Sequence, residues 1–220
     1  MVQRFKNRTD AGRRLARQLQ KYAGQDNVIV LGLPRGGVPV ALPVAKALDA
    51  PLDVFVVRKL GVPRQPEVAM GAIASGGSFV LNQSVIEALG LKDTDISEVA
   101  SRERLELARR EESYRGKRPE PDITNKIVLL VDDGLATGST MRAALMAVRA
   151  RNPARVVVAA PVGSREACTS FQNQADEVVC LETPEPFQAV GLWYEQFTQT
   201  SDREVRQCLA EAGRHLEAGT

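Results

Sequence analysis

The sequence has very little of the residues on which several enzyme classes depend. It contains one histidine, His215, so a Ser-His-Asp or Cys-His mechanism is not expected. Its three cysteines, Cys168, Cys180 and Cys208, are odd in number and form no CxxC pair. The cysteine pattern therefore indicates neither a disulfide framework nor a zinc site, and we expect reduced thiols.

The sequence also lacks a long apolar run and an overall charge bias. No run approaches the roughly 18–20 residues of a membrane span, and no secretory apolar region opens the chain. Lysine and arginine number 29 against 27 acidic residues, which gives no general attraction to nucleic acid or anionic membranes. With 220 residues, 44% of them hydrophobic, we expect one globular cytoplasmic domain with no nucleic-acid or membrane partner.

Basic residues dominate only the first 22 positions, which carry seven lysines and arginines against Asp10. An Arg-rich, acid-poor start is typical of organelle transit peptides. Thr9 and Asp10, however, are suited to cap a helix. One face of that helix would carry Ala11, Leu15, Leu19 and Tyr22. We therefore favour an amphipathic helix packed on the domain.

Short apolar runs alternate with helical patterns along most of the chain. Strands are predicted at 27–33, 52–57, 126–131, 155–162 and 177–182, and helices at 38–49, 139–151 and 164–174. Residues 58–67 are predicted as a polar loop, 68–74 with 78–82 as a hairpin, and 95–113 as a charged helix with a solvated face. This alternation predicts an α/β fold with an open, mostly parallel sheet and helices on both faces.

One stretch, VLLVDDGLATGST at 128–140, places two like charges at the end of an apolar strand. Ligands of such sheets bind at the carboxyl ends of the strands, where Asp132 and Asp133 fall. The following TGST leads into a helix, whose free amides and positive dipole end favour an anion. A ribose 5-phosphate unit fits both features, with its phosphate on 137–140 and its hydroxyls on the carboxylates. Mg²⁺ would relieve the repulsion between those carboxylates.

This stretch resembles the phosphoribosyl diphosphate signature of the type I phosphoribosyltransferases. The resemblance covers roughly residues 27–182 as a core, with a variable hood from about 1–24 and 183–220. It implies transfer of a 5-phosphoribosyl group to a nitrogenous base with release of pyrophosphate, as in nucleotide salvage. Asp132 and Asp133 would then hold the ribose and Mg²⁺, directly or through water. The predicted substrate-binding residues of the phosphate loop are Ala136, Thr137, Gly138, Ser139 and Thr140.

A second loop that the resemblance assigns to substrate is GLPRGG at 32–37. Arg35 would clamp the diphosphate with its fixed fork of donors, and Gly36 and Gly37 would give backbone access. Family members commonly hold a cis peptide in this loop. Because a cis bond is least costly before proline, we predict it at Leu33–Pro34.

The loop RKLGVPRQPE at 58–67 resembles the mobile loop that these enzymes close over the diphosphate. Arg58 and Lys59 are therefore predicted as catalytic cations. Whether Arg64 or Glu67 adds a charge or a proton donor after closure stays open. A closed lid would keep water from the reactive sugar carbon.

The hood would select the base, and its segment 182–197 concentrates four of the ten aromatic residues. Of these, Trp193 is predicted to stack on a flat ring. Family members that use hypoxanthine or guanine usually carry an acidic residue at the position of Ala136. Alanine cannot handle the purine N7 proton, so a 6-oxopurine is disfavoured.

Two other functions remain open from the sequence. The first is a non-catalytic regulator that senses phosphoribosyl diphosphate, and the second is a transferase or hydrolase acting on another phosphosugar. The sequence allows a homodimer but does not require one.

Overall fold

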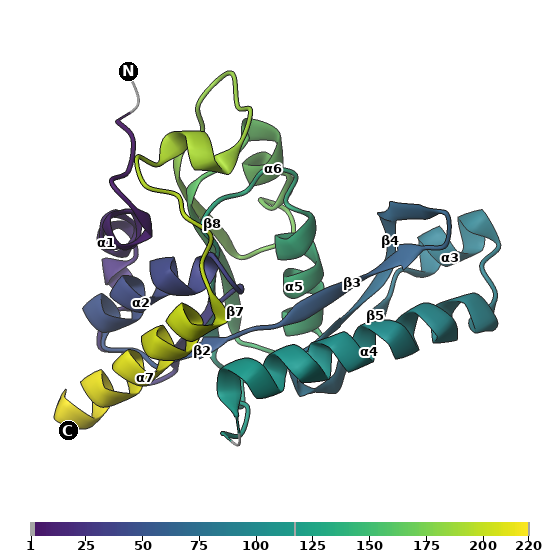
Figure 1. The fold of residues 1–220 in the computed structure, drawn as a ribbon, viewed down its shortest axis with the longest axis horizontal. Coiled ribbons are helices and arrows are strands. Elements are labelled where there is room, and N and C mark those ends of the chain that lie inside the picture. Colours follow the sequence, from purple (N-terminus) through teal and green to yellow (C-terminus); the bar gives the residue numbers. More distant parts are fainter. Residues whose placement is uncertain (1–2, 117, 220) are drawn as a thin grey trace.

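The computed structural model describes residues 3–116 and 118–219 and is built around a five-stranded sheet (Figure 1). Its strands are β1 (Val28–Gly32), β2 (Leu52–Val54), β6 (Ile127–Val131), β7 (Arg155–Val162) and β8 (Glu177–Glu182). They lie in the order β2-β1-β6-β7-β8, and every neighbouring pair is parallel. The predicted parallel sheet is confirmed, and its central strands are buried because both faces are covered.

Successive residues of the central strands point to opposite faces, and each face has its own helices. Helices α1 (Arg8–Gln18) and α2 (Gly37–Leu48) pack on one face around Val30 and Leu129. Helices α5 (Ser139–Arg149) and α6 (Arg165–Ser170) pack on the other, around Leu31 and Leu130. The prediction of helices on both faces is therefore confirmed.

A second, antiparallel sheet forms an arm beside this core (Figure 1). Its strands are β3 (Val57–Val62), β4 (Gln65–Ala74) and β5 (Ser78–Leu81), with a short 3-10 turn η2 (Ser75–Gly77) between the last two. Helices α3 (Gln83–Leu89) and α4 (Asp93–Arg115) follow, and α4 packs against β3 and β4. The arm ends where β6 returns the chain to the central sheet.

The prediction of a polar loop at 58–67 is wrong, since most of this segment is the β3–β4 hairpin. The apolar side chains of Leu60, Val62 and Met70 are buried against α4, which holds the hairpin in place. The predicted strand 52–57 is divided between two strands. β2 pairs with β1 in the central sheet, whereas β3 pairs with β4 in the arm.

The predicted N-terminal helix is present, and its predicted apolar face is buried. Its cap is Asn7, whose side chain accepts a hydrogen bond from the backbone N–H of Asp10 at 3.0 Å. The predicted Thr9/Asp10 cap is therefore wrong by two to three residues. A short 3-10 turn, η1 (Gln20–Tyr22), completes this segment.

The N-terminal segment pairs with a segment that lies shortly before the last helix. The backbone N–H of Phe5 donates to the Trp193 carbonyl at 2.9 Å, and the N–H of Glu195 donates to the Phe5 carbonyl at 2.8 Å. Trp193 ends the 3-10 turn η3 (Val190–Trp193). From here on, the name hood is kept for residues 3–7 together with 183–200, a narrower set than the expected 1–24 and 183–220. The chain then ends in α7 (Asp202–Gly219), a helix that was not predicted from the sequence and that packs on α2 and α4.

No helix in the described ranges is long and apolar enough to cross a membrane.

Candidate functional site

Two loops meet at the carboxyl edge of the central sheet, one after β1 and one after β6. Because Gly32 pairs with Val131, the residues that follow both strands emerge side by side. The N–H of Leu33 still donates to the Val131 carbonyl at 2.9 Å. A Cβ built on Gly37 would lie only 2.5 Å from the same carbonyl oxygen. The loop 33–37 therefore lies directly against the start of the aspartate motif.

The glycine before it faces the second aspartate. A Cβ built on Gly36 would lie 1.9 Å from Oδ2 of Asp133 and 3.2 Å from Nε of Arg8. No side chain larger than hydrogen fits there unless the carboxylate moves. The predicted Gly36 and Gly37 thus share one compact site with Asp132 and Asp133.

The prediction of a cis bond at Leu33–Pro34 is wrong, because the cis peptide lies between Pro34 and Arg35. Leu33 itself continues the pairing of β1 with β6 through its hydrogen bond to Val131. The Arg35 guanidinium lies 3.7 Å from the Asp202 carboxylate at the start of α7. Arg35 also lines a cavity of about 140 Å³ with Arg109, Arg110 and Tyr114.

The main partner of Asp133 is Arg8, at the first position of α1. Its Nε and Nη2 lie 2.9 and 2.8 Å from Oδ2 of Asp133. Its Nη1 donates to the Thr198 carbonyl at 2.7 Å, and its guanidinium lies 4.0 Å from the centre of the Phe197 ring. This arginine was not predicted from the sequence, because nothing local links position 8 to position 133.

The two aspartates differ in their electrostatic surroundings. Burial raises the pKa of Asp132 well above its usual range, and the neighbouring charge of Asp133 raises it further. Burial also raises the pKa of Asp133, but the Arg8 guanidinium opposes that shift. An Asp132 oxygen accepts the backbone N–H of Asp133 at 2.9 Å, and the Tyr194 hydroxyl donates to the Asp133 carbonyl at 2.6 Å. The pair is thus held in place on several sides.

The predicted phosphate loop leads into α5. Gly138 has φ 72°, and a Cβ there would lie 2.9 Å from the Phe171 ring, so glycine is required at this turn. The Thr137 hydroxyl donates to Oγ of Ser139 at 3.1 Å. Helix α5 begins at Ser139 with Thr140 next. The Ser139 N–H donates to the Thr137 hydroxyl at 3.4 Å, and the other amides of the first turn have no acceptor within the helix.

A cleft of about 370 Å³ opens beside this loop. It is lined by Ala136 and Thr137 of the loop and by Phe187 and Gln188 of the hood, together with residues of α5 and α6. The Ser164 hydroxyl donates to the Ala136 carbonyl at 2.8 Å. The cleft is thus lined by both the loop and the hood.

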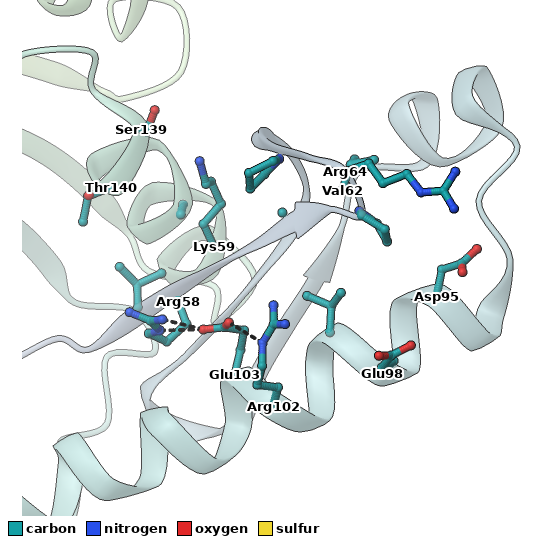
Figure 2. A pocket seen from close by; sticks show the side chains of 16 residues that line it. Arg58, Lys59, Val62, Arg64, Asp95, Glu98, Arg102, Glu103, Ser139 and Thr140 are labelled. Atoms are coloured by element: carbon teal, nitrogen blue, oxygen red, sulfur yellow. Dashed lines mark hydrogen bonds and ion pairs between the residues drawn. The ribbon is translucent and has the colours of Figure 1, made fainter.

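Arg58 and Lys59 lie on β3 and line a larger cleft of about 760 Å³ between the β3–β4 hairpin, α4 and the start of α5. Nη2 of Arg58 lies 2.6 Å from the Glu103 carboxylate, and Figure 2 shows this guanidinium turned toward α4. Lys59 extends instead on the side of Ser139 (Figure 2). Glu103 was missed, since α4 was predicted to have only a solvated charged face.

The ligand contacts of three further residues stay predictions. Arg64 lies at the turn of the hairpin with φ 67° and lines the large cleft, whereas the side chain of Glu67 lies outside the described part. Trp193 packs in the hood with Val190 and Tyr194. Its buried Nε1 has no hydrogen-bond partner within the described ranges. Stacking of Trp193 on a ligand ring is therefore still to be tested.

Comparison with known proteins gives consistent matches to one family. The model of the phosphoribosyl transferase domain matches residues 1–196. A protein of Mycobacterium tuberculosis H37Rv, whose name provisionally calls it a phosphoribosyl transferase, is 50% identical over 216 residues. That match covers 98% of this chain but 48% of the relative, so the chain spans about half the length of that curated relative.

A solved structure is similar over nearly the whole chain. The crystal structure of TT1426 from Thermus thermophilus is 44% identical, covers 94% of this chain and 98% of its own, and has a TM-score of 0.88. A more distant match is the bifunctional protein PyrR of Clostridium novyi, 29% identical over 130 residues, which are 59% of this chain and 53% of that protein.

Proposed function

Because the chain belongs to the family of phosphoribosyl transferase domains, we propose that it transfers the 5-phosphoribosyl group from phosphoribosyl diphosphate to a nitrogenous base, with release of pyrophosphate. The observation that carries this proposal is the meeting of two loops, one after β1 and one after β6, at one sheet edge. The aspartate pair, the turn before α5 and the arginine loop 33–37 all lie there. One ligand with a phosphate, two hydroxyls and a diphosphate matches that arrangement.

The phosphate would bind at the turn before α5. The amides at Ser139 and Thr140 and the hydroxyl of Thr137 supply donors, and the helix dipole favours a dianion. This group fixes the position of the sugar without taking part in bond breaking. Binding energy from the phosphate would thus orient the reacting carbon.

The ribose hydroxyls would donate to Asp132 and Asp133. Their carboxylates also favour the positive charge that grows on the sugar ring in an oxocarbenium-like transition state. The two adjacent carboxylates are oxygen donors of the kind that Mg²⁺ prefers, and the ion needs only one or two such groups alongside substrate phosphates. When bound, Mg²⁺ would neutralise charge on the leaving diphosphate.

The diphosphate would lie against the loop 33–37. Arg35 is 40% exposed and lies 3.7 Å from Asp202, so its guanidinium can turn to a ligand at little cost. Arg58 and Lys59 approach from β3 across the large cleft. Together these cations would stabilise the negative charge that develops as the bond to the sugar breaks.

The base would enter the cleft that Ala136, Thr137 and Phe187 line. A flat ring can stack there on the phenyl group of Phe187. The side chain of Ala136 offers no carboxylate to a purine N7, which favours bases other than 6-oxopurines.

The test is pyrophosphate release with phosphoribosyl diphosphate, Mg²⁺ and a panel of bases. Release that depends on one base supports transfer. The double variant D132N/D133N should lose that activity, whereas D26N, which removes an exposed carboxylate elsewhere, should keep it. An undiminished rate in the double variant would reject the site.

One feature favours a second candidate, a sensor that binds phosphoribosyl diphosphate without turnover. Two of the groups assigned to the substrate, Asp133 and Arg58, are each paired with a protein side chain. In a sensor, ligand binding would exchange these pairs for ligand contacts. Tight binding by calorimetry with no pyrophosphate release on any base would select this function.

A further inference from the structure

Arg8, the first residue of α1, was not among the predicted site residues but contacts the aspartate pair directly. We propose that Arg8 is an internal counter-cation of the aspartate pair, which keeps divalent cations off Asp133 until the sugar diphosphate arrives. The claim that the sugar diphosphate ends this exclusion rests on the proposed function. The claim that Arg8 excludes divalent cations concerns the free protein alone.

The Arg8–Asp133 pair has the geometry of a built contact. Two nitrogens of the guanidinium reach the same carboxylate oxygen at 2.9 and 2.8 Å, and the side chains are only 12% and 17% exposed. Charge-assisted hydrogen bonds of this kind are short and among the stronger ones in proteins.

Arg8 is also fixed from its other sides. The third nitrogen donates to the Thr198 carbonyl at 2.7 Å, and the guanidinium face lies 4.0 Å from the Phe197 ring centre. The pair is therefore tied to the hood and is not a solvated surface contact, which would exchange freely with ions in solution.

This arrangement leaves the aspartates poorly suited to hold a cation alone. Oδ2 of Asp133 already accepts a hydrogen bond from Nε of Arg8 and lies 2.8 Å from Nη2, so the positive charge of the guanidinium opposes a divalent cation at this oxygen. No group of three or more Asp, Glu, His or Cys side chains suited to a metal occurs among the described residues. Mg²⁺ requires six oxygen ligands in near-octahedral geometry, so the remaining ones must come from water and the ligand. The cation is thus expected to enter together with the sugar diphosphate.

The test uses Mn²⁺ as the probe, with free and bound ion distinguished by electron paramagnetic resonance in the absence of any sugar. Wild type should bind Mn²⁺ only weakly, with a Kd in the millimolar range. R8Q should bind it at least tenfold more tightly, because the substitution removes the positive charge of the guanidinium beside the Asp133 carboxylate. R13Q removes the same charge from an exposed position of the same helix and should match wild type. R8K retains the charge and should stay close to wild type.

Adding D133N to R8Q should abolish the gain, which locates the bound ion. Equal Mn²⁺ affinity in wild type, R8Q and R13Q would overturn the proposal, as would an equal gain in R13Q. If R8Q does not fold, wild type still decides: Mn²⁺ bound with a micromolar Kd and lost in D133N would also overturn it. None of these measurements needs turnover, so a protein that proves to be no transferase can still pass or fail them.

Discussion

Replacement of Gly36 by alanine gives a sharp test of the contact between the loop 33–37 and the aspartate pair. Gly36 has φ −65° and ψ −31°, which alanine adopts without strain, so the backbone itself does not oppose the change. The new Cβ would lie 1.9 Å from Oδ2 of Asp133. We therefore expect the carboxylate to rotate away and to lose the hydrogen bond and the ion pair that it makes with Arg8.

The magnitude follows from two opposing terms. Loss of hydrogen bonds between charged groups costs about 1.5–3 kcal/mol. Alanine also lowers the conformational entropy of the unfolded chain, which stabilises the folded state by about 0.4–1 kcal/mol. The variant G36A should thus be less stable by about 1–2 kcal/mol, which for a chain of this length lowers Tm by roughly 2–8 °C.

The assay is a double-mutant cycle with R8Q, with unfolding by urea followed by circular dichroism. In the R8Q background the Asp133 carboxylate has no guanidinium to lose, so G36A should be neutral or slightly stabilising. G37A is the matched control, because its Cβ would meet the Val131 carbonyl at 2.5 Å, and its cost should not depend on Arg8. An equal cost of G36A in both backgrounds would refute the assigned contact.

Three further substitutions test other parts of the structure. Y194F removes the hydroxyl that donates to the Asp133 carbonyl at 2.6 Å. It should lower the free energy of unfolding by about 1–3 kcal/mol in urea titrations, and an unchanged value would contradict the bond. R115M leaves the Asp53 carboxylate, 3.0 Å from the Arg115 guanidinium, without its buried partner and should cost about 3–5 kcal/mol at pH 7. Burial already raises the pKa of Asp53, and loss of the arginine raises it further. Stability of R115M should therefore fall as pH rises from about 4 through that pKa, and a cost equal at pH 4 and pH 7 would reject this explanation. G138A places a side chain at φ 72° and should lower the free energy of unfolding by about 1–2 kcal/mol. It should also weaken binding of phosphoribosyl diphosphate, measured by calorimetry. Unchanged binding would show that this turn does not hold the phosphate.

The central sheet could be predicted from sequence because its signals are local. The apolar run before Asp132 and the glycine-containing turn after it determine a strand, a loop and a helix within one stretch of chain. Parallel pairing then brings the loop 33–37 to the same edge without any further information. For this reason the predicted Gly36 and Asp133 lie together.

The remaining features depend on contacts between distant segments. The hairpin at 57–74 replaces a predicted loop because Leu60 and Met70 pack on α4, a helix that comes later in the chain. Glu103 was assigned to a solvated face for the same reason, although it contacts Arg58. No residue close to Arg8 in the sequence indicates that it contacts Asp133.

The final helix is a different case, because its signal was present in the sequence. Val205, Leu209 and Ala212 recur at helical spacing and are buried. A systematic count of periodicity over the last 20 residues would have predicted α7.

The hood is expected to unfold locally before the central sheet does. Arg8 and the carbonyl of Thr198 are 190 positions apart, and Phe5 joins residues almost equally distant in sequence. Local opening costs least where few buried apolar residues hold a segment, and the cluster around Phe5 and Tyr194 is much smaller than those on the two faces of the central sheet. Backbone amides of Phe5 and Glu195 should therefore exchange with deuterium long before those of β6 and β7. The Asp133 carboxylate, which Arg8 contacts, would then be uncovered by a motion that leaves the central sheet intact.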